Sequence, residues 1–90
     1  MPRYIVQRTV PAGIRSPLTS GGSAACRAMV EQNAEEGVTW LNSFISEDKT
    51  HTYCVCDAPT PEAIRRAATR NRLPVDEITQ VRVRDPYFYV

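Results

Sequence analysis

The sequence predicts one small α+β domain, spanning residues 1–90, in which strands alternate with two helices. Its length suits a single domain. Short stretches rich in β-branched and aromatic residues alternate with two stretches whose apolar residues recur at helical spacing. Turn and cap residues separate these stretches, and no linker or repeat interrupts them. These three observations favour short connections and a compact sheet covered by helices.

The first third of the chain predicts a strand, a loop and a helix. Residues 3–10 (RYIVQRTV) have the composition of a strand. Proline, serine and glycine in residues 14–22 indicate a loop. Apolar residues at helical spacing then predict a helix over residues 23–36, and Gly37 stands where a left-handed C-cap belongs.

The middle of the chain predicts a β-hairpin. Residues 38–46 (VTWLNSFIS) and 50–58 (THTYCVCDA) both read as strands, and the polar turn Glu47-Asp48-Lys49 separates them. Such a short connection favours antiparallel pairing of the two strands.

A second helix and a last strand follow. Thr60 is a good N-cap, and Pro61 suits the first helical position. The helix is expected to end at Leu73-Pro74, and residues 76–84 (DEITQVRVR) alternate as a strand does. The expected buried stripe of this helix is Ala63, Ile64, Ala67 and Ala68.

The resulting order is βαββαβ. Each βαβ half requires a right-handed crossover, and the split arrangement of the two halves is the ferredoxin-like motif. We therefore expect a four-stranded antiparallel sheet with both helices on one face.

Composition argues against several function classes. Eleven Lys and Arg balance ten Asp and Glu, so no basic excess points to nucleic acid. No apolar run is long enough to span a membrane. Three cysteines without an export signal are typical of reduced thiols, so we expect a cytoplasmic protein.

The sheet is expected to be apolar on both faces, which predicts a homodimer. Strict alternation places Trp40 and Phe44 on one side, with Leu41 and Ile45 on the other. Two helices cover only one face, so a second copy is the economical cover for the other. Trp40 and Phe44 are therefore candidate interface residues, with ordinary core packing as the alternative.

The C-terminal tail is also apolar. Three of its last four residues are aromatic, which favours packing either on the chain's own sheet or across a dimer. The tail residues expected at the interface are Tyr87, Phe88 and Tyr89.

His51, Cys54 and Cys56 form the one cluster of soft metal donors on a single strand. Cys54 and Cys56 are expected to share a face, with His51 on the other. The C-x-C spacing does not match structural zinc sites, although a dimer could complete a half-site. Cys26, predicted on the core side of the first helix, could approach these thiols, and Asp57 is either a ligand or a turn residue. Alternatively, all three thiols are small buried hydrophobes.

No motif identifies a reaction. The paired carboxylates stand at the ends of elements, where solvated charges are normal, and no glycine-rich phosphate loop is present. We therefore expect a non-enzymatic domain. The alternative is a binder or enzyme of the dimeric α+β barrel kind, with a small-molecule pocket between helices and sheet.

Three segments resemble a known family: MPRYIVQRT, GVTWLNSFISEDKTHTYCVCDAPTPEAIRRAA and LPVDEITQVR. They are similar to small bacterial domains of the nickel-responsive, or nickel-binding, protein family, most of which have no known function. The most specific part is Tyr53-Cys54 followed by Asp57-Ala58-Pro59. The resemblance implies a ferredoxin-like homodimer and nickel as the metal.

The resemblance also implies where donors belong. Nickel-binding members carry histidines on the first helix and near the end of the second, at positions that correspond here to Cys26 and to Asn71 or Arg72. Cys54 matches the cysteine of the family, and Asp57 stands where an acidic residue is common. Because His51 is the single histidine, a nickel site in this chain requires thiolates or both subunits.

Overall fold

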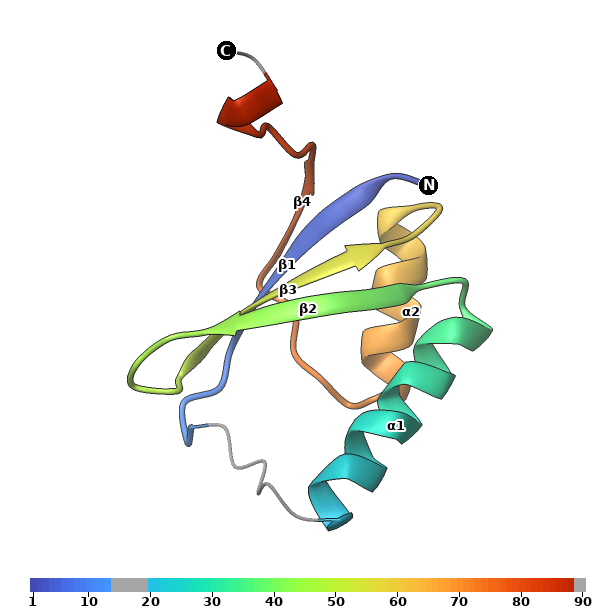
Figure 1. The fold of residues 1–90 in the computed structure, drawn as a ribbon. Coiled ribbons are helices and arrows are strands. Elements are labelled where there is room, and N and C mark those ends of the chain that lie inside the picture. The colour runs from blue at the N-terminus through green and yellow to red at the C-terminus, as the bar shows by residue number, and fades with distance from the viewer. Residues whose placement is uncertain (14–19, 89–90) are drawn as a thin grey trace.

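The computed structural model describes residues 1–13 and 20–88, without the side chains of residues 20–25 and of Phe88. Residues 14–19 of the expected loop lie outside the described residues, and the prediction of a loop over residues 20–22 is wrong because the first helix already begins at Ser20. The elements are β1 (Arg3–Thr9), α1 (Ser20–Glu35), β2 (Thr39–Ile45), β3 (His51–Asp57), α2 (Pro61–Arg70), β4 (Glu77–Val81) and a final 3₁₀ turn (Pro86–Phe88) (Figure 1). This order confirms the predicted βαββαβ sequence of elements.

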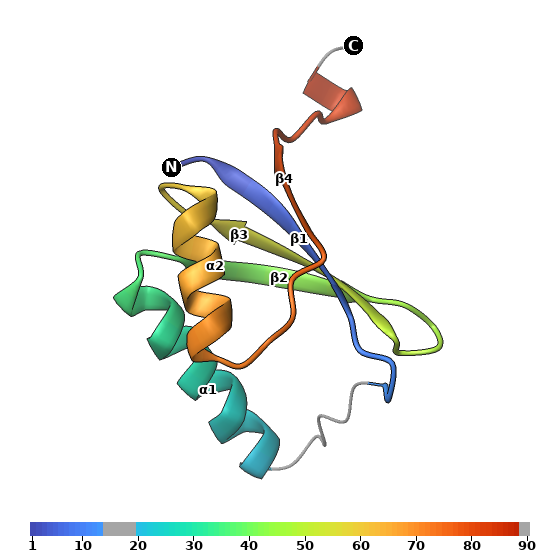
Figure 2. The ribbon, with the colours of Figure 1, turned by 180° about the vertical axis from the view of Figure 1, so that it is seen from behind.

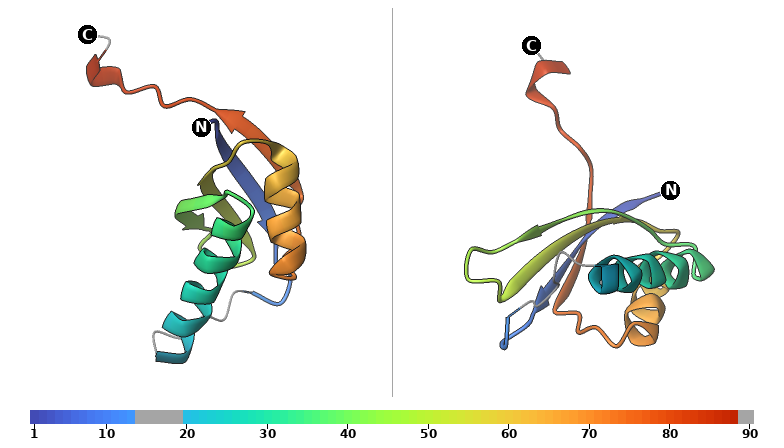
Figure 3. Two further views of the ribbon diagram at one scale, coloured as in Figure 1. Left: turned by 90° about the vertical axis from the view of Figure 1, so that its right-hand side faces the viewer. Right: turned by 60° about the horizontal axis from the view of Figure 1, so that its bottom comes forward.

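The four strands form one antiparallel sheet in the order β2-β3-β1-β4. Both helices lie on the same face of this sheet, as Figures 2 and 3 show. The predicted ferredoxin-like arrangement is thereby confirmed. Among the described residues, no helix is long and apolar enough to cross a membrane.

The second helix begins as its sequence predicts. The hydroxyl of Thr60 accepts a hydrogen bond from the backbone N–H of Ala63 at 3.2 Å, and Pro61 occupies the first turn. The four predicted stripe residues are all buried, with Ile64 only 2% exposed. The helix ends at Arg70, three residues before the predicted stop.

Gly37 ends α1 as predicted. Its φ is +76°, a left-handed conformation that a side chain disfavours. The N–H of Gly37 donates to the carbonyl of Ala34 at 3.0 Å, and the N–H of Val38 donates to the carbonyl of Asn33 at 2.9 Å. This pair of bonds is a Schellman motif, and it turns the chain so that Val38 enters the core.

Ion pairs join the two helices at one end of the layer. Arg66 donates to Glu36 at 2.9 Å, and Arg70 donates to Glu36 at 3.1 Å and also to Glu35. The hydrogen bond from Arg66, followed by that from Arg70, lowers the pKa of Glu36. These contacts hold the end of α1 beside α2 over the sheet.

The core lies between the helices and the two central strands. Tyr4 and Val6 of β1 and Cys56 of β3 face the helices, and Val6 is completely buried. Because β1 pairs with both β3 and β4, its helix-facing side chains lie at the centre of the domain.

A β-bulge corrects one prediction about β2. The pairing with β3 skips a residue between Trp40 and Asn42, so Leu41 has no partner. The skipped residue reverses the alternation, and Trp40 faces the helices whereas Phe44 points to the uncovered face. The prediction that Trp40 and Phe44 share a face is wrong because it assumed regular pairing.

The chain leaves the body of the domain after β4, which ends at Val81 and not at the predicted Arg84. Figures 1 and 3 show the tail projecting away from the sheet. Tyr87 is 90% exposed, so its side chain does not pack on its own sheet. Only the backbone of Phe88 is described, and Tyr89 lies outside the described residues.

Candidate functional site

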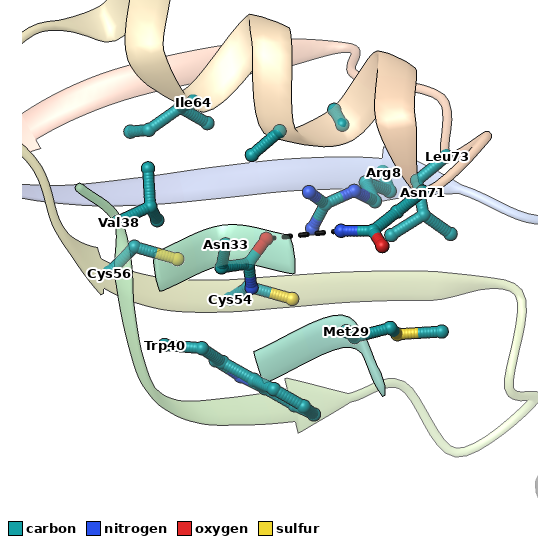
Figure 4. Close-up of a pocket in the computed structure, with 12 residues that line it drawn as sticks. Arg8, Met29, Asn33, Val38, Trp40, Cys54, Cys56, Ile64, Asn71 and Leu73 are labelled. Atoms are coloured by element: carbon teal, nitrogen blue, oxygen red, sulfur yellow. Dashed lines mark hydrogen bonds between the residues drawn. The ribbon is translucent and has the colours of Figure 1, made fainter. Parts of the chain in front are cut away.

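A cavity of about 60 Å³ lies between the helices and the sheet. This is where the alternative interpretation of the sequence, a small-molecule binder, places a pocket. Figure 4 shows side chains from the helices and from the sheet around it. The lining residues come from β1 and β3 (Arg8, Cys54, Cys56), from α1, the start of β2 and the segment that leads into it (Met29, Asn33, Val38, Trp40), and from α2 and the segment that follows it (Ile64, Ala67, Ala68, Asn71, Leu73).

Arg8 brings a positive charge into this layer. It follows Tyr4 and Val6 at every second position of β1, so its side chain leaves the same face of the sheet. Its Nε is buried and has no hydrogen-bond partner among the described residues. Sequence reasoning missed Arg8, although the alternation of Tyr4, Val6 and Arg8 in one predicted strand contained the signal.

Two asparagines lie beside Arg8. The Nδ2 of Asn71 donates to the Oδ1 of Asn33 at 3.0 Å and links the C-terminal ends of the two helices. Figure 4 shows the guanidinium of Arg8 turned towards this pair. The polar groups of the cavity are thus gathered at the end where α2 stops, and the remaining walls are mainly apolar.

Cys54 faces the cavity at the end of a short chain of hydrogen bonds. The indole Nε1 of Trp40 donates to Ser43 Oγ at 2.8 Å, and Ser43 Oγ donates to the sulfur of Cys54 at 3.0 Å. The bulge in β2 makes this possible because it turns Trp40 towards the helices. Trp40 is therefore half-buried core, the alternative that the sequence left open.

Cys56 shares the face of Cys54, as predicted, but differs in character. Burial, the largest cause, raises the pKa of the Cys56 thiol to about 11. At neutral pH this group is a protonated, small hydrophobic side chain rather than a thiolate ligand.

The other predicted donors lie elsewhere. Cys26 is exposed on α1, so the prediction that it faces the core is wrong. It lies in the N-terminal half of α1, and Figures 1 and 3 show this half extending beyond the sheet, where no strand lies beneath it. His51 is exposed on the face opposite Cys54, as predicted, with its Nδ1 2.9 Å from Thr50 Oγ1.

Asp57 forms an ion pair. Arg3 Nε donates to Asp57 Oδ1 at 2.9 Å, and this hydrogen bond lowers the pKa of the Asp57 carboxyl. The two residues stand opposite each other on neighbouring strands. Asp57 is therefore engaged in cross-strand pairing, on the face of the sheet opposite Cys54 and Cys56.

The donor residues do not assemble a metal site within one chain. Across residues 1–13 and the described part of 20–88, no group of three or more His, Cys, Asp or Glu side chains is placed to hold a metal ion. The cysteines of β3 point inward, His51 points outward, and Cys26 lies on the outside of α1. A complete nickel site in a single copy does not fit these positions.

The sheet face opposite the helices is open and partly apolar. Phe44 is 62% exposed, Leu41 43% and Tyr53 38%. The half-buried Val55 on β3 and its partner Ile5 on β1 extend this face. No described element of the chain covers this face. This open apolar face is a candidate contact surface.

Comparison with known proteins identifies relatives of this fold. A sequence model described as "Nickel responsive protein SCO4226-like" matches residues 4–81. The solved structures include SCO4226 from Streptomyces coelicolor A3(2), which superposes with a TM-score of 0.70 at 21% identity, covering 92% of this chain and 99% of that one. No curated protein matches the chain.

Proposed function

Because the chain belongs to the family of SCO4226-like nickel-responsive proteins, we propose that it is a non-enzymatic homodimer that binds nickel with donors from both subunits. The observation that supports this most directly is the open sheet face, on which Phe44 of the outer strand β2 is 62% exposed. Burying the apolar side chains of this face against a second copy removes them from water, which stabilises the pair.

The positions of the donors support a shared site. His51, Tyr53 and Asp57 stand an even number of residues apart on β3, so all three belong to the open face. A two-fold dimer formed through this face brings two copies of every such residue to one interface. Imidazole is a favoured nickel ligand, so we assign the first donor role to His51 of each subunit.

The test combines molecular mass and nickel titration on untagged protein. We expect sedimentation to give a dimer for the wild type and a monomer for Phe44→Asp, because a charge at this face cannot be buried unpaired. Calorimetric titration with NiCl₂ should show binding to the wild type and at least about tenfold weaker binding to Phe44→Asp and His51→Ala, equivalent to about 1.4 kcal/mol.

Val30→Asp is the matched control, since Val30 is an exposed apolar residue on α1, away from the open face. It should leave both mass and nickel affinity unchanged. A monomeric wild type refutes the dimer, and full nickel affinity in a monomeric Phe44→Asp refutes the shared site. A wild type that binds no nickel refutes the metal role.

A further inference from the structure

Arg8 has an unmet electrostatic requirement. Its Nε is buried beneath the helices without a hydrogen-bond acceptor, and none of the ion pairs among the described residues involves it. Removing a cationic N–H from water without giving it an acceptor is unfavourable, and native structures seldom tolerate it. An anion in the neighbouring cavity would supply the missing acceptor.

The surroundings of Arg8 restrict the charge of that anion. Among the described residues, Arg8 is the one cationic residue that lines the cavity, so a single negative charge balances it. Asn71 adds hydrogen-bond capacity, because its amide has two N–H groups and Asn33 takes one of them. A phosphate dianion would leave a second charge unpaired against apolar walls, whereas a carboxylate matches the planar fork of a guanidinium.

The rest of the cavity favours a ligand with a short apolar tail. Met29, Trp40 and Leu73 line it with apolar surface. A water molecule occupies about 10–15 Å³ of cavity volume measured in this way. The cavity volume of 60 Å³ therefore accommodates roughly four to six non-hydrogen atoms. Acetate, propionate and butyrate fall in this range.

We infer that the cavity between helices and sheet is a binding site for a short-chain monocarboxylate, with Arg8 as the anion-binding residue. The carboxylate accepts hydrogen bonds from the guanidinium of Arg8, with the free N–H of Asn71 beside it. The aliphatic tail lies against Trp40 and Met29. This site lies on the helix side of the sheet and requires neither nickel nor a second subunit.

The protein contains its own reporter for this site. Trp40 is the single tryptophan of the chain and lines the cavity, so its fluorescence responds to an occupant. Titration of the full chain with sodium propionate, at constant ionic strength and without nickel, should give a saturable change with a Kd of about 1 mM or tighter. The same titration with propionamide, which has nearly the same shape but no charge, should be at least about tenfold weaker.

Variants separate the role of Arg8 from general charge effects. Arg8→Met keeps the length of the side chain and removes its charge, so propionate affinity should fall at least about tenfold. Arg8→Lys should retain part of the affinity, and Arg65→Met, which changes an exposed arginine outside the cavity, should retain all of it. Phe44→Asp should bind propionate as the wild type does, whatever its oligomeric state.

Several results overturn the inference. These are an unsaturable response in the wild type, equal affinity for propionamide, an equal response to chloride at the same concentration, and unchanged propionate affinity in Arg8→Met. If circular dichroism shows Arg8→Met to be unfolded, the comparison of propionate with propionamide on the wild type, together with Arg8→Lys, decides the question.

Discussion

Replacing Ile64 by alanine tests how tightly the helix layer is packed on the sheet. Ile64 is 2% exposed and lines the wall of the cavity. The substitution removes three carbon groups at about 0.8 kcal/mol each, or about 2.4 kcal/mol of transfer free energy. The void that remains adds to this loss, so we expect a destabilisation of about 3–4 kcal/mol.

The expected change in melting temperature follows from the size of the chain. An unfolding entropy of about 2.1 cal/mol/K per residue gives about 0.19 kcal/mol/K for 90 residues. A loss of 3 kcal/mol then lowers Tm by about 16 °C. Urea unfolding, followed by Trp40 fluorescence and by circular dichroism, measures the free energy directly.

Ile64→Val is the matched control. It removes one carbon group and should cost about 1 kcal/mol. Both variants are measured at one protein concentration and again in the Phe44→Asp background, so that subunit association does not alter the comparison. An alanine variant that loses less than about 1 kcal/mol, or no more than the valine variant, refutes the packing described for α2.

Three further outcomes follow from the structure. Thr60→Ala should lower the free energy of unfolding by about 1 kcal/mol and Thr60→Ser by much less, because serine keeps the capping oxygen; urea unfolding measures both. The hydrogen bond from Thr50 is the largest cause that lowers the pKa of Asp48 to about 2. The stability that the ionised Asp48 carboxylate contributes is therefore complete at pH values above its unfolded-state pKa near 3.9 and is lost as pH falls through about 2. Asp48→Asn should therefore weaken the dependence of the urea midpoint on pH between about pH 5 and pH 2. Iodoacetamide at neutral pH should label exposed Cys26 quickly and buried Cys56 only after urea is added, as peptide mass spectrometry would show; equal rates would contradict the burial of Cys56.

Local signals in the sequence predict most of the fold. Thr60 and Pro61 predict where α2 begins, because an N-cap hydrogen bond and the fixed φ of proline each depend on the identity of one residue. Gly37 predicts the end of α1 in the same way, through its positive φ. The alternation in residues 76–84 predicts a strand, but the observed strand ends at Val81, three residues before the predicted end. Pairing with β1 stops at Val81, and only tertiary contact determines that point.

The site was less predictable, because it depends on which way side chains point. One skipped residue in β2 turns Trp40 towards the helices, and the amino-acid composition of this segment does not predict a bulge. Cys26 has the helical spacing of a core position, yet the N-terminal end of α1 extends beyond the sheet. The exposure of Cys26 therefore depends on the length of α1 relative to the strands. Arg8 is difficult to predict as a cavity residue because a charged residue in a strand is usually solvated.

The bulge in β2 also limits how the protein can associate. As an outer strand of the sheet, β2 has one row of backbone groups without a partner strand. A straight strand from a neighbouring molecule cannot stay in register across the kink at Leu41, which discourages edge-to-edge growth of sheets into fibrils. The irregularity that orients one tryptophan therefore also acts as a safeguard against polymerisation.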